Sequence, residues 1–150
     1  MNLEELIKDL DENLVVLESQ RKENTIYIKC EMNTNQSKCP YCESLSNSVH
    51  SKYTRTISDL PIQNNKVKLL IVVRKFFCSN LNCAHKTFGE KLNFTSAKSV
   101  KTNRLINYIN HIGLRDNSMD AVRTLEESGI KISSSTVLRI IKKNKNKHNL

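Results

Sequence analysis

The stretch Cys39-Pro40-Tyr41-Cys42 has a counterpart downstream, Cys78-Ser79-Asn80-Leu81-Asn82-Cys83. Each stretch holds two cysteines on a short turn, and four thiolates are a ligand set of structural Zn²⁺. The gap from Cys42 to Cys78 is longer than in compact zinc fingers, so the segment between must itself fold. We therefore predict a zinc ribbon in which Cys39, Cys42, Cys78 and Cys83 bind one structural Zn²⁺. Loss of the metal is expected to unfold residues 30–92.

The Cys-Pro-Tyr-Cys motif has a second interpretation, because glutaredoxin-like oxidoreductases use the same letters as a redox dithiol. That fold needs an apolar strand before the motif and a helix after it. Here a polar segment, residues 33–38, precedes the motif, and residues 43–48 lack a helical apolar period. The sequence favours zinc, with the dithiol oxidoreductase as an alternative.

Length and charge restrict the class of protein. A chain of 150 residues with a net charge of +9 can hold one medium domain or two small ones. Basic residues outnumber acidic ones by eleven to four in residues 98–150, whereas acidic residues predominate in residues 1–24. A basic C-terminal part predicts a polyanionic partner, most simply double-stranded DNA, although such a tail can also be merely solvated. Five cysteines and no apolar stretch of signal or membrane length predict a cytoplasmic protein without disulfides or membrane contact.

The apolar pattern of residues 1–97 predicts a short helix followed by strands. Leu3, Leu6, Ile7 and Leu10 repeat at helical spacing. The expected strands are residues 14–18, 25–31, 51–58 and 66–77, with a loop at 20–24 and a break at Asp59-Leu60-Pro61, and residues 87–90 close the module. We expect residues 1–97 to form one domain, an N-terminal hairpin with the zinc ribbon.

From about residue 98 the apolar period changes from two to 3.6, which predicts three helices. Gly113 is expected to end the first with a positive φ, Ser118 to cap the second, and Ser133 to cap the third. A Gly-containing turn at Gly129 between the last two predicts a helix-turn-helix in residues 98–150, although three helices can also pack without binding DNA. The candidate DNA contacts are Ser134, Ser135, Arg139, Lys142 and Lys143, with Lys52, Arg55 and Arg74 added from the strands.

Taken together, the motifs resemble one group of bacterial insertion-sequence transposases, the ISL-three type. The resemblance runs from about Leu14 to Lys143. It rests on the order of the predicted hairpin and the two cysteine pairs, the second followed by Phe88 and Glu90. Four further segments add to it: Val49 to Arg55, Asp59-Leu60-Pro61, Val72 to Cys78, and Ser135 to Arg139. It implies an α+β protein whose zinc-binding region and helix-turn-helix bind the terminal inverted repeats of a mobile element.

The family's DDE nuclease domain has no counterpart before Leu150. The resemblance therefore implies a DNA-binding portion without catalysis, which could join a homo-oligomer or a full-length transposase. The alternatives are a zinc-ribbon module that binds protein and a small transcriptional regulator.

Three remaining residues have open roles. His50 and His85 are candidate additional zinc ligands, and each has a simpler explanation as an ordinary surface residue. Cys30 alternates with Ile26 and Ile28 in a predicted strand, so we expect it to be an apolar core residue.

Overall fold

The computed structural model describes residues 2–148, which contain a mixed sheet and four helices. The helices are α1 (Leu3–Lys8), α2 (Asn103–Arg115), α3 (Ser118–Glu127) and α4 (Ser134–His148). The strands are β1 (Leu14–Lys22), β2 (Thr25–Met32), β3 (Ser37–Lys38), β4 (Leu45–Ser46), β5 (Val49–Ile62), β6 (Asn65–Phe77) and β7 (Thr87–Gly89). Within this part of the chain, no helix combines the length and apolar character needed to cross a membrane. The predicted α+β class is confirmed.

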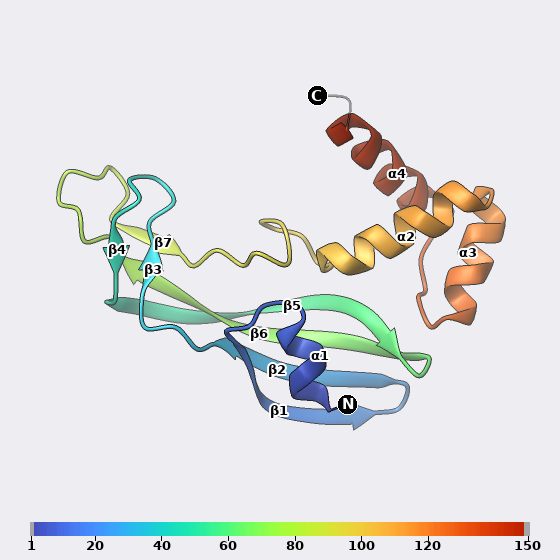
Figure 1. Ribbon diagram of the computed structural model, residues 1–150, viewed down its shortest axis with the longest axis horizontal. Helices are drawn as coiled ribbons and strands as arrows, with labels where there is room; N and C mark the ends of the chain where they lie inside the picture. Colours follow the sequence, from blue (N-terminus) through green and yellow to red (C-terminus); the bar gives the residue numbers. More distant parts are fainter. Residues whose placement is uncertain (1, 149–150) are drawn as a thin grey trace.

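Two antiparallel hairpins make up the main sheet, in the strand order β1-β2-β6-β5. They join through β2 and β6, which run parallel, and β7 pairs with the end of β6 that extends beyond β2. Figure 1 shows the result: β3, β4 and β7 gather at one end of the long β5–β6 hairpin, and α2, α3 and α4 lie toward the other.

Both hairpins have tight turns, and the first is tighter than the sequence predicts. β1 runs to Lys22, so the loop expected at residues 20–24 shrinks to Glu23 and Asn24, with a positive φ of 57° at Glu23. The β5–β6 turn has positive φ at both Gln63 and Asn64, the backbone of a two-residue hairpin turn. Gln20, Arg21 and Lys22 are polar, so the sequence suggested a loop, but their backbones still form hydrogen bonds with β2.

The expected strand break at Asp59-Leu60-Pro61 is wrong. β5 continues to Ile62, with a register shift between Asp59 and Ile62. β5 lies at the edge of the sheet, where a proline without an amide hydrogen costs no ladder bond. The shift lets the segment turn side chains toward the helices.

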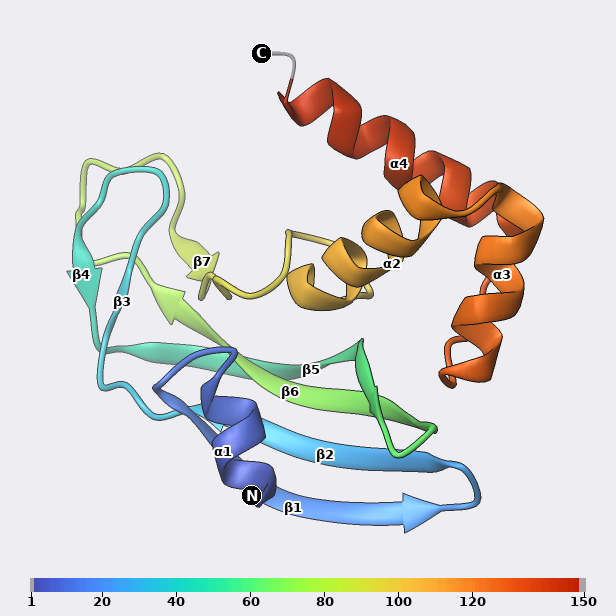
Figure 2. The ribbon, with the colours of Figure 1, turned by 45° about the vertical axis from the view of Figure 1, so that its right-hand side comes forward.

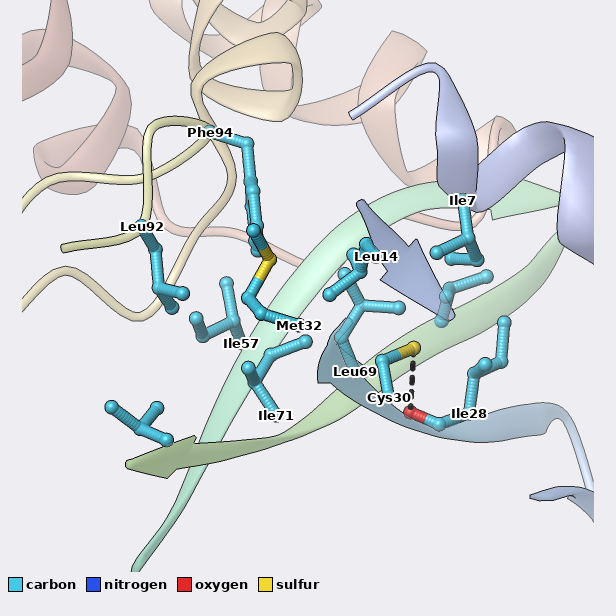
Figure 3. Close-up of a cluster of buried hydrophobic side chains, with 12 residues drawn as sticks. Ile7, Leu14, Ile28, Cys30, Met32, Ile57, Leu69, Ile71, Leu92 and Phe94 are labelled. Carbon is cyan, nitrogen blue, oxygen red and sulfur yellow. Dashed lines mark hydrogen bonds between the residues drawn. The ribbon is translucent and has the colours of Figure 1, made fainter. Parts of the chain in front are cut away.

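The first core lies on one face of the sheet. This face is covered by α1 and by Leu92 and Phe94, which belong to the linker between β7 and α2 (Figures 1 and 3). Its sheet members include the alternating apolar residues of β6, together with Ile28, Cys30 and Ile57 from the neighbouring strands. The Cys30 side chain is fully buried, as predicted, and its thiol lies 3.8 Å from the carbonyl oxygen of Ile28. Burial raises the pKa of Cys30 to about 12.

A second core joins α2, α3 and α4. Leu105, Ile109, Ala121, Leu125 and Val137 are among its buried members. Like the first core, it is built from residues with a regular apolar period.

Gly113 lies inside α2, so the prediction that it ends this helix is wrong. Its role is packing: a Cβ there would lie 2.7 Å from Ile141 and 2.9 Å from Val137 of α4. The absence of a side chain therefore allows α4 to approach α2 closely.

The helix caps agree only partly with the sequence analysis. Asn117, not Ser118, caps α3, and its side chain accepts a hydrogen bond from the amide of Asp120. Ser133 does precede α4, where its hydroxyl accepts from the amide of Thr136 at 3.2 Å. The α3 prediction was one residue out because Asn and Ser are both good caps.

A buried carboxylate connects the sheet to the helices. Asp59 accepts hydrogen bonds from the Thr102 hydroxyl at 2.8 Å and from the Arg104 guanidinium, with which it forms an ion pair. Thr102 also caps α2, because its hydroxyl accepts from the amide of Leu105. Leu60 packs against the helical core. The Asp59-Leu60 pair is therefore the docking element for α2.

Gly129 makes a second connection between the sheet and the helices. Its φ is +99°, and a Cβ there would lie 2.8 Å from the carbonyl oxygen of Asn64 in the β5–β6 turn. Figures 1 and 2 agree that the end of α3 lies beside this turn. Glycine is required here both for its backbone conformation and for the close approach.

Replacing Arg104 tests the Asp59 connection. Arg104→Ala leaves a buried carboxylate without its cation, and we expect a loss of about 3 kcal/mol in the free energy of unfolding. Urea titration followed by circular dichroism measures this loss. The control is Arg115→Ala, which removes an exposed arginine paired with Asp116 and should change stability by less than about 0.5 kcal/mol. Equal losses in the two variants would contradict the assignment.

Candidate functional site

The open end of the β5–β6 hairpin brings the two cysteine stretches together. Val49 at the start of β5 pairs with Phe76 near the end of β6. Cys78 follows β6 directly, and the first stretch lies between β3 and β4, which precede β5. The long gap between the cysteine pairs is therefore filled by a strand pair, as predicted.

Each stretch is a tight turn held by backbone hydrogen bonds. In the first, the amide of Cys39 donates to the carbonyl of Ser44 and the amide of Glu43 donates to the carbonyl of Cys39, both at 2.9 Å. In the second, the amide of Cys83 donates to the carbonyl of Asn80 at 3.1 Å. The amide of Cys78 donates to Lys86 at 2.8 Å, which closes the loop that contains this turn.

These turns place the four sulfur atoms in one cluster. The Sγ atoms of Cys39, Cys42, Cys78 and Cys83 all lie within 4.8 Å of one another, and those of Cys42 and Cys78 are 3.5 Å apart. Tetrahedral Zn²⁺ with ~2.3 Å bonds to sulfur requires sulfur–sulfur distances of ~3.8 Å. Cys39 and Cys83 are buried and the other two are half-buried. The number, type and spacing of these ligands fit a closed structural zinc site.

Comparison with known families agrees with this geometry. Residues 35–83 match the family model for the zinc-finger of transposase IS204/IS1001/IS1096/IS1165. The matched segment begins just before the first cysteine pair and ends at Cys83. No curated protein and no solved structure matches the chain. The four cysteines bind a structural Zn²⁺.

The zinc end, which consists of β3, β4, β7 and the two cysteine turns, has little apolar core of its own. Its buried cluster consists of Phe76 and Phe88, whose rings stack at 5.7 Å, with Cys39 and Cys83. Two of the four residues in this cluster are therefore metal ligands. The first core, around Cys30, is separate and contains none of the four ligands. Metal loss should consequently disorder β3, β4, β7 and their loops while the rest of the sheet persists, a narrower region than the expected residues 30–92.

Arg74 is not an exposed DNA contact, and this prediction is wrong. Its guanidinium is buried and pairs with Glu90 at 2.8 Å, while its backbone amide also donates to Glu90. Thr34 accepts two further hydrogen bonds from it. The pair fills the gap on β6 between the end of β2 and the start of β7. The sequence analysis missed this pair because alternation placed Arg74 on a solvent face, and only the topology brings Glu90 to it.

The two histidines lie beside the metal centre without joining its ligand set. His85 packs edge-on against Tyr41, and His50 packs against Phe77. The metal-ligating cluster found in the described residues contains the four cysteines alone. The dithiol alternative also lacks support, since the Cys39-to-Cys42 turn leads into β4 and not into a helix.

The remaining predicted DNA contacts fall into two groups. On the sheet, Lys52 is exposed and lies 3.9 Å from Glu31, whereas Arg55 donates to the carbonyls of Ser96 and Ser99 in the linker. Arg55 therefore has a structural role. On α4, Ser134 is half-buried, and the exposed residues are Ser135, Arg139, Lys142 and Lys143.

The protonation of the thiols reflects their proximity. Hydrogen bonds from Ser44 lower the pKa of Cys42 to about 6. The backbone of Asn80 acts to lower the pKa of Cys78, but burial and the adjacent thiols raise it to about 12. The pKa of Cys83 is also raised: a backbone hydrogen bond at His85 opposes the rise, and burial and Cys42 cause it. Clustered thiols cannot all ionise without a cation, so metal binding must displace protons.

Serine substitution distinguishes ligand from core cysteine. Cys39→Ser removes one thiolate, and we expect it to lose stoichiometric zinc and the fixed structure of the zinc end. Cys30→Ser is the control, because Cys30 lies in the other core and should leave the zinc content unchanged. Atomic absorption on protein purified without chelator measures the metal. Full zinc content in Cys39→Ser, or equal loss in both variants, would refute the assignment.

Zinc affinity should fall as the pH falls. Without metal, Cys78 and Cys83 favour their protonated forms at pH 7, because burial and the neighbouring thiols raise the pKa of both groups. Binding releases at least these two protons, so the apparent affinity should decrease by about 100-fold or more per pH unit below neutrality. Competition with a chromophoric chelator at pH 6.5 and 7.5, corrected for chelator protonation, measures the slope. A pH-independent affinity would contradict it.

Proposed function

We propose that this chain is the zinc-dependent DNA-binding portion of a transposase-like protein, which recognises the terminal inverted repeats of an insertion sequence. In this proposal residues 1–97 form the hairpin and zinc-ribbon domain, and residues 98–150 form a helix-turn-helix region with a basic tail. α4 is the recognition helix and α3 supports it. The match of residues 35–83 to a transposase zinc-finger supports the family assignment.

The outer surface of α4 is the observation that carries the proposal. Val137 is fully buried, so one side of α4 packs inward against α2. Ser135, Arg139 and Lys142 follow one another at helical spacing on the exposed side. Short hydroxyl side chains at the start of a helix can approach base edges, and arginine is the usual partner of guanine. Lysines farther along suit phosphate contacts.

We propose no catalysis by these residues. A two-metal nuclease needs several carboxylates free to bind Mg²⁺ in a rigid scaffold. Asp59 and Glu90 are the buried carboxylates of residues 2–148, and each is occupied by an arginine. The matched family model describes a zinc-finger and not a nuclease.

A protein-binding role is the second candidate, and one observation favours it. Large apolar side chains are exposed around the metal turns, with Leu81 90% exposed and Tyr41, Leu45 and Phe77 also exposed. Such side chains suit contact with a second copy of the chain or with a full-length transposase. The two candidates are compatible, because the zinc end and α4 are different surfaces (Figure 1).

Duplex titration tests the DNA proposal. Arg139→Ala should weaken binding to the element's terminal repeats by about 1–3 kcal/mol and relax preference at one base pair. Lys142→Ala and Lys143→Ala should weaken all sequences alike and flatten the salt dependence. Fluorescence anisotropy against the repeat and a scrambled duplex, at two salt concentrations, measures both effects.

The matched control is Arg21→Ala, which removes an exposed arginine of β1 and leaves α4 intact, and this variant should bind like the wild type. Indistinguishable binding to the repeat and the scrambled duplex would reduce the protein to a nonspecific basic one. Absence of any DNA binding would favour the protein-binding candidate.

A further inference from the structure

A groove of about 460 Å³ lies where the sheet meets the helices. One wall is formed by β5 and β6, through Ser58 and Lys68, and the other by the linker before α2 and the turn before α4. Backbone bonds hold the walls together: the amide of Ser58 donates to Val100 at 2.8 Å, and the amide of Thr102 donates to Ser58 at 2.9 Å. The groove is therefore a fixed feature of the junction between sheet and helices.

Four lysines from three parts of the chain line this groove. Lys66 and Lys68 come from β6, Lys101 from the linker and Lys131 from the turn that leads into α4. Asp59 also lines it, but its carboxylate is already paired with Arg104. None of the four lysines forms an ion pair within residues 2–148. The positive charge is left uncompensated.

The charge of Arg139 on α4 reaches the same place. The pKa of Lys101 is lowered, first by burial and then by repulsion from Arg139 and Lys68. Lys68 donates to the hydroxyl of Ser58 at 2.8 Å, which holds its ammonium group in the groove. The groove therefore lies close enough to α4 for the charges of Lys101 and Arg139 to repel each other.

We propose that this groove binds backbone phosphates of the duplex whose bases α4 contacts. Lysine is a point charge that pairs with phosphate without base preference, and the four lysines line one groove, with Lys131 three residues before the start of α4. The sheet then contributes DNA contacts through Lys66 and Lys68 of β6. This inference rests on the proposed function and adds a site that extends beyond the matched segment, because Lys101 and Lys131 lie outside residues 35–83.

The test compares two double variants with equal loss of charge. Lys68→Ala with Lys101→Ala removes two groove cations, and Lys8→Ala with Lys22→Ala removes two exposed lysines of α1 and β1. Loss of two phosphate contacts should reduce the slope of log affinity against log salt by about 1.8 and weaken binding roughly tenfold or more. The control should keep the wild-type slope.

Phosphate substitution locates the contact. In duplexes with single neutral methylphosphonates, wild-type affinity should drop at one or two positions beside the α4 site. The Lys68/Lys101 variant should show no further drop at those positions. Lys68→Gln with Lys101→Gln repeats the experiment with longer neutral side chains, and zinc content and thermal unfolding verify the fold of each protein.

The outcomes separate this inference from the function on which it rests. Unchanged binding by the groove variant, or equal losses in groove and control variants, overturns the groove while Arg139→Ala still tests α4. Saturable binding of pyrophosphate that leaves DNA affinity unchanged also overturns it, in favour of a small phosphate ligand. If the wild-type chain binds no duplex, both proposals fail.

Discussion

The antiparallel pairing of β5 with β6 is the constraint on which the other parts of this protein depend. The two strands pair from Val49 and Phe76 at one end to Ile62 and Asn65 at the other, with one register shift near each end. At ~3.4 Å per residue the hairpin spans about 40 Å. Its open end brings both cysteine pairs together, and its closed end carries the docking element for the helices. A slip of one residue would exchange the core and solvent faces along the whole hairpin.

Each end of the hairpin also contains a buried arginine–carboxylate pair. Arg74 and Glu90 fill the gap between β2 and β7, and Arg104 and Asp59 attach α2 to β5. Buried pairs contribute little net stability, because desolvation offsets their attraction. Both partners must nevertheless come together in the folded protein, since either one alone would be an unpaired buried charge, which is strongly destabilising. The two pairs therefore restrict how the zinc end and the helices can attach to the sheet.

The size of each apolar core explains why one part of the protein needs a metal ion and the others do not. The sheet and the helices bury enough apolar surface to hold their own cores, whereas the zinc end relies on Phe76, Phe88 and metal ligands. Metal binding energy replaces apolar burial there. This leaves apolar side chains such as Leu81 and Tyr41 on the outside, where they are available to a partner. The lysine-lined groove lies where the sheet meets the helices, so the zinc site and the positively charged groove are on separate parts of the surface.

The amino-acid sequence by itself determined the zinc ligands, the α+β class, the burial of Cys30 and the three C-terminal helices, because each depends on local spacing or period. The sequence placed the turns and helix caps only approximately. The cap of α3 was one residue out because Asn117 and Ser118 are both suitable cap residues. Only the tertiary structure decided that Arg74 is buried, that Gly113 is a packing residue, and that Lys68 and Lys101 face one groove. These facts depend on which strands become neighbours, and that choice is made by burial and charge pairing between residues far apart in the chain.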